Sequence, residues 1–314
     1  MLNALSKAFF LTLATNRPLQ RLASRYGLRK PSSFGRRFIA GESTADAIDA
    51  ARVVQAAGLS ISLDLLGESV LTLDEADAAT RGCVAMIRDV VDAGIERNVS
   101  LKLTQLGLDV DHATAVDNLR KVLTLADRHD FFIRIDMEGS PYTQETLDIW
   151  ETLWGLGHRR LGVVLQSALR RSEADAQRVI EQGGRIRLVK GAYKEPKAIA
   201  YQTKADVDDA FVRIMRVLLK DAEYPAIATH DPAMIAATRA RATELGLASD
   251  RFEFQMLYGV RRDLQAALAA DGYRVRVYIP FGREWFPYFM RRLGERPANV
   301  AFVIRAMLRD RGGA

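Results

Sequence analysis

The segment Ser60-Ile61-Ser62-Leu63-Asp64-Leu65 is a short apolar run that is followed by a segment of helix length, and this unit recurs along the chain. Strands and helices in strict alternation pair as parallel strands through right-handed crossovers. Eight such units close most naturally into a barrel, so the sequence predicts an α/β fold of the (βα)8 TIM-barrel type. A doubly wound open sheet remains the alternative. The expected strands are 60–65, 99–103, 131–135, 161–165, 185–189, 225–228, 251–254 and 274–278.

Hydroxyl residues three positions before a carboxylate mark the starts of several expected helices. Residues 1–58 precede the first strand, and we expect them to form an N-terminal helical extension that packs on a barrel of residues 59–314. Because no low-complexity linker interrupts the sequence, the whole chain, 1–314, is expected to be one catalytic domain. The hydroxyl–carboxylate pairs are Ser43 with Asp46, Thr72 with Glu75, Ser172 with Asp175, and Thr203 with Asp206.

The composition is that of a globular protein with a substantial core, since 48% of the residues are hydrophobic and 27% are charged. The single cysteine, Cys83, excludes an internal disulfide and fits a reducing compartment. It falls within a helical pattern and is expected to be structural. No apolar run approaches the roughly 20 residues that a membrane-spanning helix needs. We therefore expect a cytoplasmic protein.

The net charge of +6 is concentrated at the N-terminus. Residues 1–40 contain eight basic residues and no acidic one, and Arg17, Arg21, Arg25 and Arg29 recur every four residues along one side of a helix. This stripe has three interpretations: a solvated helix face, a contact with the inner membrane surface or an acidic partner, and an organelle transit peptide. Aromatic residues are not interleaved with these charges, so no nucleic-acid partner is expected.

Each expected strand ends on a side chain that can ionise or form hydrogen bonds. In a (βα)8 barrel the chemistry collects at the C-terminal ends of the strands, so these groups predict an active site at the barrel mouth. They are Asp64 with Glu68 beyond it, Lys102, Asp136 with Glu138, Gln166, Lys190 with Tyr193, Thr229-His230-Asp231, Gln255 and Tyr278.

Structural explanations stay open for three of these residues. Asp136 could cap the following helix, and Lys102 could be its ion-pair partner. His230 could be an ordinary turn residue, or it could face a phosphate, because a helix is expected to begin at Pro232 and offers unpaired N–H groups.

Other motifs limit the chemistry. Asp109, Asp111 and His112 match no standard metal-site spacing, and a loop with an N-cap explains them better, so no metal is expected. P-loop, G-x-S-x-G and H-E-x-x-H motifs are missing from the sequence. The Gly155-Leu156-Gly157 segment lacks a third glycine and precedes a strand. A bound dinucleotide would therefore be held by the barrel mouth and not by a Rossmann fold.

The expected last helix carries four polar residues on one face, above the barrel mouth. Tyr288, Arg291, Arg292 and Glu295 are spaced i, i+3, i+4 and i+7, just after a strand that turns at 278–282. Adjacent arginines beside a tyrosine form a planar, permanently charged clamp that suits a small carboxylate. A solvated arginine face is the alternative interpretation.

Six segments carry motifs that occur together. They are Leu63-Asp64-Leu65-Leu66-Gly67-Glu68, Ser100-Leu101-Lys102-Leu103, Arg187-Leu188-Val189-Lys190-Gly191-Ala192-Tyr193, Ala228-Thr229-His230-Asp231, Phe252-Glu253-Phe254-Gln255-Met256-Leu257-Tyr258-Gly259 and Tyr278-Ile279-Pro280-Phe281-Gly282. Together with the arginine helix, over residues 35–308, they resemble the proline dehydrogenase family. The likeness is to its short monofunctional bacterial type, which lacks the fused aldehyde dehydrogenase and DNA-binding parts of the long bifunctional relatives.

The resemblance implies an FAD-dependent flavoprotein oxidoreductase of proline catabolism. Such an enzyme oxidises L-proline to Δ1-pyrroline-5-carboxylate, the first step of degradation to glutamate. Hydride passes to flavin N5, and the electrons then pass to a quinone of the membrane. The protein supplies orientation and electrostatics, and the flavin carries the hydride chemistry.

The resemblance also assigns roles to individual residues. Lys102, Arg291 and Arg292 would hold the proline carboxylate, and Glu68 would pair with an arginine as part of a gate. Asp136, Tyr278 and Tyr288 would line the ring pocket, and Asp136 and Tyr278 would act with the two arginines in catalysis. Lys194 stands where the bifunctional relatives have an aromatic residue, so it is given no role. Apolar walls would come from Ala192, Tyr193 and Leu257, and FAD contacts from Gln166, Arg187, Val189, Lys190, Gly191, Thr229, His230 and Glu295.

Further expectations concern the chemistry. Arg187 and Lys190 would favour negative charge on the reduced flavin, and no side chain is a compelling base for the substrate amine. A second hypothesis is a barrel lyase or aldolase with Lys190 or Lys102 as its Schiff-base nucleophile. A third is a basic scaffold without catalytic activity. Flavin absorbance that L-proline bleaches without oxygen would favour the first hypothesis over both others.

Overall fold

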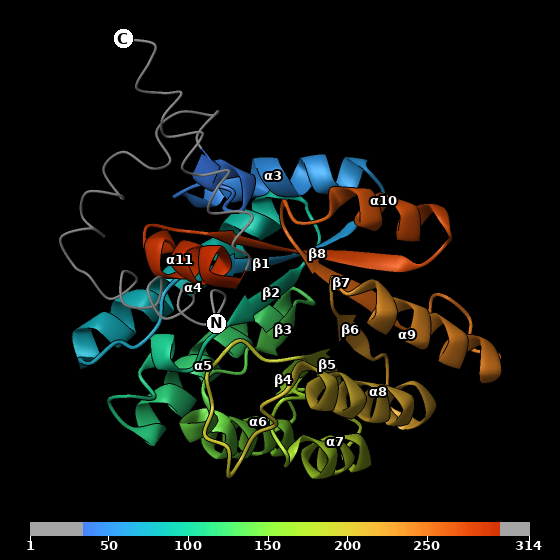
Figure 1. Cartoon of the computed structure of the whole chain (residues 1–314). Coiled ribbons are helices and arrows are strands. Elements are labelled where there is room, and N and C mark those ends of the chain that lie inside the picture. Colours follow the sequence, from blue (N-terminus) through green and yellow to red (C-terminus); the bar gives the residue numbers. More distant parts are fainter. Residues whose placement is uncertain (1–33, 296–314) are drawn as a thin grey trace, which may run out of the picture.

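Eight parallel strands form a closed barrel in the computed structural model, which describes residues 34–295, with side chains up to residue 290 (Figure 1). The strands follow one another around the barrel in chain order, and β8 pairs with β1 to close it. The predicted (βα)8 fold is therefore confirmed. The strands are β1 (Ser60–Leu65), β2 (Asn98–Leu101), β3 (Phe132–Ile135), β4 (Leu161–Gln166), β5 (Arg185–Val189), β6 (Ala226–Ala228), β7 (Glu253–Leu257) and β8 (Arg274–Phe281).

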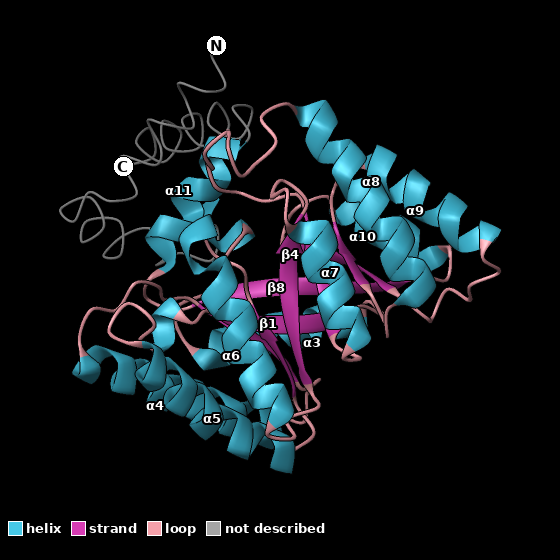
Figure 2. Ribbon diagram, turned by 90° about the horizontal axis from the view of Figure 1, so that it is seen from below, coloured by secondary structure: helices cyan, strands magenta, loops and turns pink. Residues whose placement is uncertain are grey.

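Helices surround the strands, as the two views of the molecule show (Figures 1 and 2). Helix α3 packs against β1 and β8, so it covers the seam where the barrel closes. The arginine stripe of residues 17–29 lies outside the described residues. The helices are α3 (Thr44–Ala56), α4 (Leu73–Ala93), α5 (His112–Arg128), α6 (Thr143–Gly155), α7 (Ser172–Glu181), α8 (Lys204–Asp221), α9 (Pro232–Glu244), α10 (Arg262–Ala270) and α11 (Trp285–Glu295), with short 3-10 helices η1 (Phe34–Arg37), η2 (Thr104–Leu106) and η3 (Ser140–Tyr142).

Three strands differ from the prediction by two or three residues at one end or both, and β3, β4 and β6 differ by one residue at one end. Strand β2 ends at Leu101, before Lys102, because the chain turns there into η2. Strand β7 begins and ends later than expected, since the turn at 248–252 precedes it and its last residues pair with β8. Strand β8 runs on to Phe281, because its end stays in register with β1 and because the Pro280 carbonyl accepts a hydrogen bond from Ala40.

Three of the four expected helix caps are present. Ser43, Thr72 and Thr203 are N-caps whose side chains accept from the backbone N–H three residues later. The fourth prediction, at Ser172, is wrong. The Ser172 hydroxyl instead donates to the carbonyl of Gln166 at 2.6 Å, and Asp175 forms an ion pair with Arg171.

A charged network closes the N-terminal end of the barrel. Arg276 donates to both carboxylate oxygens of Glu253 at 2.8 and 2.9 Å, and also to Glu96 and to the carbonyl of Ile61 at 2.6 Å each. This network fills the floor of the barrel, at the end opposite to the one where the strands finish.

Two further observations concern the described part of the chain. None of its helices is both long enough and apolar enough to cross a membrane. Cys83 is buried in α4, where burial raises the pKa of its thiol to about 12, so it remains a protonated, structural thiol.

Candidate active site

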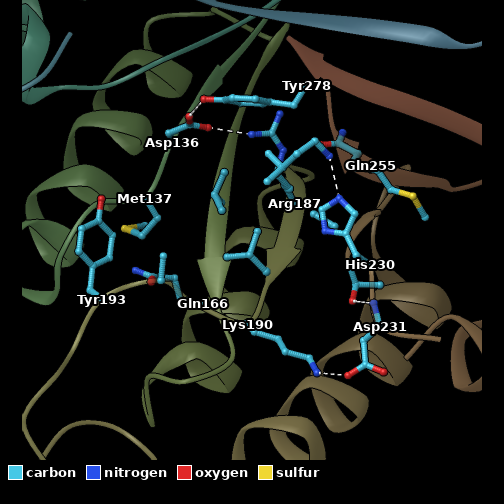
Figure 3. Close-up of a pocket in the computed structure, with 18 of the residues that line it drawn as sticks. Asp136, Met137, Gln166, Arg187, Lys190, Tyr193, His230, Asp231, Gln255 and Tyr278 are labelled. Carbon is cyan, nitrogen blue, oxygen red and sulfur yellow. Dashed lines mark hydrogen bonds and ion pairs between the residues drawn. The ribbon is translucent and has the colours of Figure 1, made fainter. Parts of the chain in front are cut away.

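A cavity of about 580 Å³ lies at the C-terminal ends of the strands (Figure 3). Most of the predicted site residues line it. Glu68 lies in the loop after β1 and does not line the cavity. The side chains of Arg291, Arg292 and Glu295 lie outside the described residues. The predicted residues in the lining are Lys102, Asp136, Gln166, Arg187, Val189, Lys190, Gly191, Ala192, Tyr193, Thr229, His230, Leu257, Tyr278 and Tyr288.

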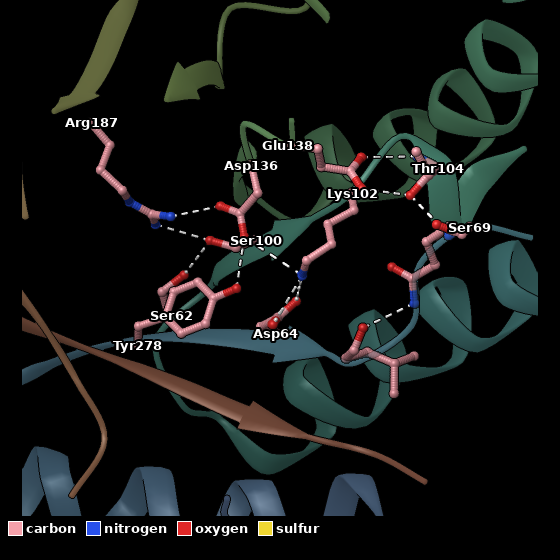
Figure 4. Close-up of polar contacts among 12 residues, drawn as sticks. Ser62, Asp64, Ser69, Ser100, Lys102, Thr104, Asp136, Glu138, Arg187 and Tyr278 are labelled. Carbon is pink, nitrogen blue, oxygen red and sulfur yellow. Dashed lines mark hydrogen bonds and ion pairs between the residues drawn. The ribbon is translucent and has the colours of Figure 1, made fainter. Parts of the chain in front are cut away.

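Asp136 is the centre of a buried polar cluster at the mouth (Figure 4). It follows β3 and accepts hydrogen bonds from Arg187 Nη1 and from the Tyr278 hydroxyl, each at 2.7 Å. Burial, with Asp136 close by, raises the pKa of Tyr278 well above its ordinary value, so the hydroxyl stays a donor. The alternative that Asp136 merely caps a helix is wrong, because the N-cap of α6 is Tyr142.

Lys102 lies beside this cluster, directly after β2. Its ammonium is 3.3 Å from both carboxylate oxygens of Asp64 and 3.8 Å from Asp136. Burial by itself would lower the pKa of Lys102, but the surrounding carboxylates outweigh that effect and raise the pKa above its ordinary value. A lysine held as an ammonium is not a nucleophile, so this environment disfavours the Schiff-base hypothesis at Lys102.

Gln166 and Gly191 form a close contact at the ends of β4 and β5. The Gln166 amide donates to the carbonyl of Glu138 at 2.8 Å. Gly191 has a φ of +108°, and a Cβ there would lie 2.9 Å from the Gln166 Oε1 atom. Glycine is needed here because the backbone is left-handed and because there is no room for a side chain.

Lys190 lies on the outer wall of the cavity, between two carboxylates (Figure 3). Its ammonium forms ion pairs with Asp208 of α8 and, at 2.7 Å, with Asp231. Asp231 is the N-cap of α9, and the hydrogen bond from Lys190 lowers the pKa of its carboxyl group to about 2. The charge of Lys190 is therefore already balanced within the protein.

His230 joins the loop after β6 to the end of β7. Its Nε2 atom accepts a hydrogen bond from the backbone N–H of Leu257 at 2.9 Å. This bond requires Nε2 to be unprotonated, so a neutral ring carries its proton on Nδ1. The contact fixes the ring at the cavity wall, next to the N-terminus of α9.

Several residues of the site were missed by the sequence analysis. Ser62 and Ser100 are buried and bonded to each other at 3.1 Å, and Ser100 accepts from Arg187 at 2.9 Å. The sequence feature that could have identified Ser62 is the alternation in β1, where polar residues 60, 62 and 64 share one face of the strand. Met137 and Arg261 also line the cavity, and no pattern in the sequence marked them.

The residues 109–112 do not form a metal site. Asp111 is the N-cap of α5, as expected, and Asp109 accepts a hydrogen bond from the Tyr142 hydroxyl at 2.7 Å. Within residues 34–290, no group of three or more histidine, cysteine, aspartate or glutamate side chains could hold a metal ion.

Comparisons with known proteins agree on one family. The model of the proline dehydrogenase family matches residues 47–305. Proline dehydrogenase 2 of Bacillus subtilis is 40% identical over 303 residues, which cover 96% of this chain and 99% of that protein. The proline dehydrogenase of Deinococcus radiodurans is 39% identical over 313 residues, which cover 98% of this chain and 100% of that protein.

The barrel also resembles solved structures of larger proteins. A crystal structure of proline utilization A from Bdellovibrio bacteriovorus, inactivated by N-propargylglycine, superposes with a TM-score of 0.77 and 27% identity over 82% of this chain. This chain spans only 32% of the length of that protein, so the likeness concerns one part of it.

Proposed function

The chain belongs to the proline dehydrogenase family and oxidises proline, and we propose that it does so in the cavity at the barrel mouth. The product would be Δ1-pyrroline-5-carboxylate. The observation that carries this proposal is the buried cluster of Lys102, Asp136, Arg187 and Tyr278, which lies where a barrel enzyme has its chemistry. We also propose that residues 1–314 form one catalytic domain.

The substrate carboxylate is proposed to bind Lys102 together with Arg291 and Arg292. Lys102 is already paired with Asp64 and Asp136, so it offers little uncompensated positive charge to another anion. Further cations are therefore needed. Tyr288 lines the cavity, and the two arginines follow it by three and four positions on α11, which puts them on the same helix face.

FAD is the proposed cofactor, and the cavity has features that fit it. Its wall combines apolar side chains, among them Val164, Val189 and Met256, with the amide of Gln166. The Nε atom of Arg187 is buried without a hydrogen-bond partner among the described residues, so a bound group could use it. When bound, FAD supplies the acceptor for the hydride of proline. The proposed contacts are Gln166, Arg187, Val189, Lys190, Gly191, Thr229, His230 and Glu295.

The ion pairs change one expectation about this site. Arg187 is paired with Asp136, and Lys190 is paired with Asp208 and Asp231. These ion pairs reduce the net positive charge that either side chain would present to the cofactor. Their proposed role is to position groups by hydrogen bonding.

The amine of proline must lose its proton before hydride leaves. Tyr278 is kept protonated, and Asp136 already accepts two strong hydrogen bonds, so neither is a good base. We propose that proline reacts in its deprotonated form, which Asp136, Tyr278 and Tyr288 orient. The apolar side of the ring would face Ala192, Tyr193 and Leu257.

Electrons are proposed to pass on to a membrane quinone. The basic N-terminal region, which lies outside the described residues, would then contact anionic lipid on the inner face of the membrane. Salt-sensitive binding of the full chain to anionic vesicles, lost on deletion of residues 1–30, is the outcome that this idea requires.

The decisive experiment is anaerobic addition of L-proline to the purified protein while its visible absorbance is followed. The proposal expects a yellow protein whose flavin absorbance is bleached by L-proline. A colourless protein that borohydride links to a substrate through Lys190 or Lys102 would overturn it in favour of the lyase.

A further inference from the structure

The loop between β5 and α8, residues 190–203, forms a strap across one side of the cavity. Its first residues, Lys190 to Tyr193, line the cavity. Figure 1 shows this yellow loop reaching to the side of the barrel where α5 and α6 lie. Tyr193 and Met137, which follows β3, both line the cavity (Figure 3). The strap thus spans from β5, past β4, to the end of β3.

Both ends of the strap are tied to the loop that follows β4. At the start, the backbone N–H of Ala168 donates to the carbonyl of Lys190 at 2.9 Å. At the far end, Tyr201 donates to the carbonyl of Ala168 at 2.8 Å, and Ala200 pairs with Leu169. The part of the strap without backbone pairing to this loop is therefore 192–198, beyond the left-handed Gly191.

One side chain ties this middle part to the opposite wall. The carboxylate of Glu195 accepts a hydrogen bond from the backbone N–H of Ser140 at 2.9 Å, and the Ser140 hydroxyl donates to it as well. Residues 193–199 are all exposed except Glu195, which is half-buried. Ser140 begins η3, which leads into α6, so the carboxylate meets a backbone N–H at the start of a helical segment.

We propose that Glu195 is a positioning residue that latches the strap to Ser140 and so holds Ala192 and Tyr193 over the bound substrate. The inference rests on the proposed function of the cavity. The strap's root, with Lys190 and Gly191, is fixed by backbone pairing and does not depend on the latch. The groups around Asp136 lie on other strands and do not depend on it either.

Because the latch is separate from the groups around Asp136, its loss is predicted to change KM more than kcat. If the strap is closed in only a fraction of the molecules, the apparent affinity for substrate is the affinity of the closed state multiplied by that fraction. A substrate bound under the closed strap still reacts as before. Loss of hydrogen bonds to a charged, partly exposed group is expected to raise the KM for proline about five- to tenfold. The kcat is expected to change less than about twofold.

The test uses the full-length flavin-loaded protein and two readouts. Glu195→Ala is expected to accelerate hydrogen exchange of residues 192–198 severalfold and to raise KM with kcat nearly unchanged. Glu195→Gln should restore much of both properties, because its amide oxygen can still accept from the Ser140 N–H. Ser140→Ala, which leaves the strap sequence intact, should show a smaller change, and adding it to Glu195→Ala should cause little further loss. Glu223→Ala, which removes an exposed carboxylate paired with Arg185 elsewhere, is the matched control.

Unchanged exchange in Glu195→Ala would overturn the latch, whether or not proline is the substrate, because exchange does not depend on turnover. Faster exchange with an unchanged KM would overturn the positioning role. If wild-type protein failed to oxidise proline, the proposed function would fall, and the exchange measurement would still decide the latch.

Discussion

Asp64 and Asp136 share the ammonium of Lys102 at the mouth of the barrel, where Asp64 and Lys102 are buried and Asp136 faces the cavity. Burial raises the pKa of Asp64, and Asp136 adds to that effect while Lys102 opposes it. An isolated buried carboxylate would be costly, so each member of this group depends on the others for its charge. The site is therefore sensitive to single changes that leave one charge unpaired.

The ion pair between Asp231 and Lys190, on the cavity wall, can be tested by a substitution that leaves the fold intact. Its pKa is lowered from 3.8 to about 2 by the hydrogen bond from Lys190, so its ionised form stabilises the folded state. That stability is fully present above about pH 4 and is lost as the pH falls toward 2. Asp231→Asn keeps the N-cap of α9, because asparagine caps as well as aspartate, and removes only the charge.

Wild-type protein should thus be more stable than Asp231→Asn by about 1 kcal/mol at neutral pH, allowing for solvent screening. Urea unfolding measured at a series of pH values should show this difference shrinking below pH 4. A difference that stays constant down to the lowest pH at which the protein folds would argue against the ion pair.

At the scale of elements, the alternation of strand and helix segments predicted the fold, and the polar residues at the strand ends predicted the site. Strands β1 and β5 have the predicted bounds, because polar and apolar residues largely alternate in each of them and helical patterns flank them. The late start of β7 could not be predicted, because it depends on pairing with β8 and not on composition. The Ser172 cap failed for a similar reason: the carbonyl of Gln166, brought close by the fold, competes for its hydroxyl.

The site was predictable for the same reason as the fold. Lining residues such as Asp136 and Gln166 follow strands, and a barrel brings strand ends together. What the sequence could not reveal is which charges neutralise each other. Asp208, which pairs with Lys190, lies in the second turn of α8 and carries no motif of its own. Ion pairing between distant elements depends on geometry that only the folded chain supplies.

Helix α11 carries the prediction for the substrate clamp. Arg291→Ala or Arg292→Ala is expected to raise the KM for proline about 100-fold or more, because each removes a charge-assisted contact to a carboxylate. Bound flavin should remain, since other elements supply most of its proposed contacts. Arg283→Ala, at an exposed position just before the helix, is the control. Near-normal proline kinetics in both clamp variants would refute the proposed role of this helix face.

The whole barrel separates stability from chemistry by placing different polar clusters at its two ends. The Arg276 network fills the floor and ties β7 and β8 to the carbonyl of Ile61 in β1, across the seam where the barrel closes. The Asp136 cluster lies at the mouth. The barrel therefore contains one cluster of charged side chains at its floor and another at its mouth. Because the two clusters lie apart, each can be tested by its own substitutions.

Arg276→Met should therefore destabilise the fold and leave the site nearly unchanged. The substitution leaves the buried Glu253, and also Glu96, without the cation that pairs with them. We expect this change to lower the free energy of unfolding by about 3–5 kcal/mol. Adding Glu253→Gln should recover part of that loss, because the unpaired charge disappears. The KM for proline of the folded Arg276→Met protein should stay within about twofold of wild type, since Arg276 does not line the cavity.

Arg239→Ala, which breaks an exposed ion pair with Asp271, is the matched control and should cost less than about 1 kcal/mol. Denaturant unfolding of the four proteins would measure these differences. If Arg276→Met were no less stable than Arg239→Ala, the floor network would not hold the seam of the barrel. Closure would then rest on the backbone pairing of β1 with β8 and on the packing of α3 over it.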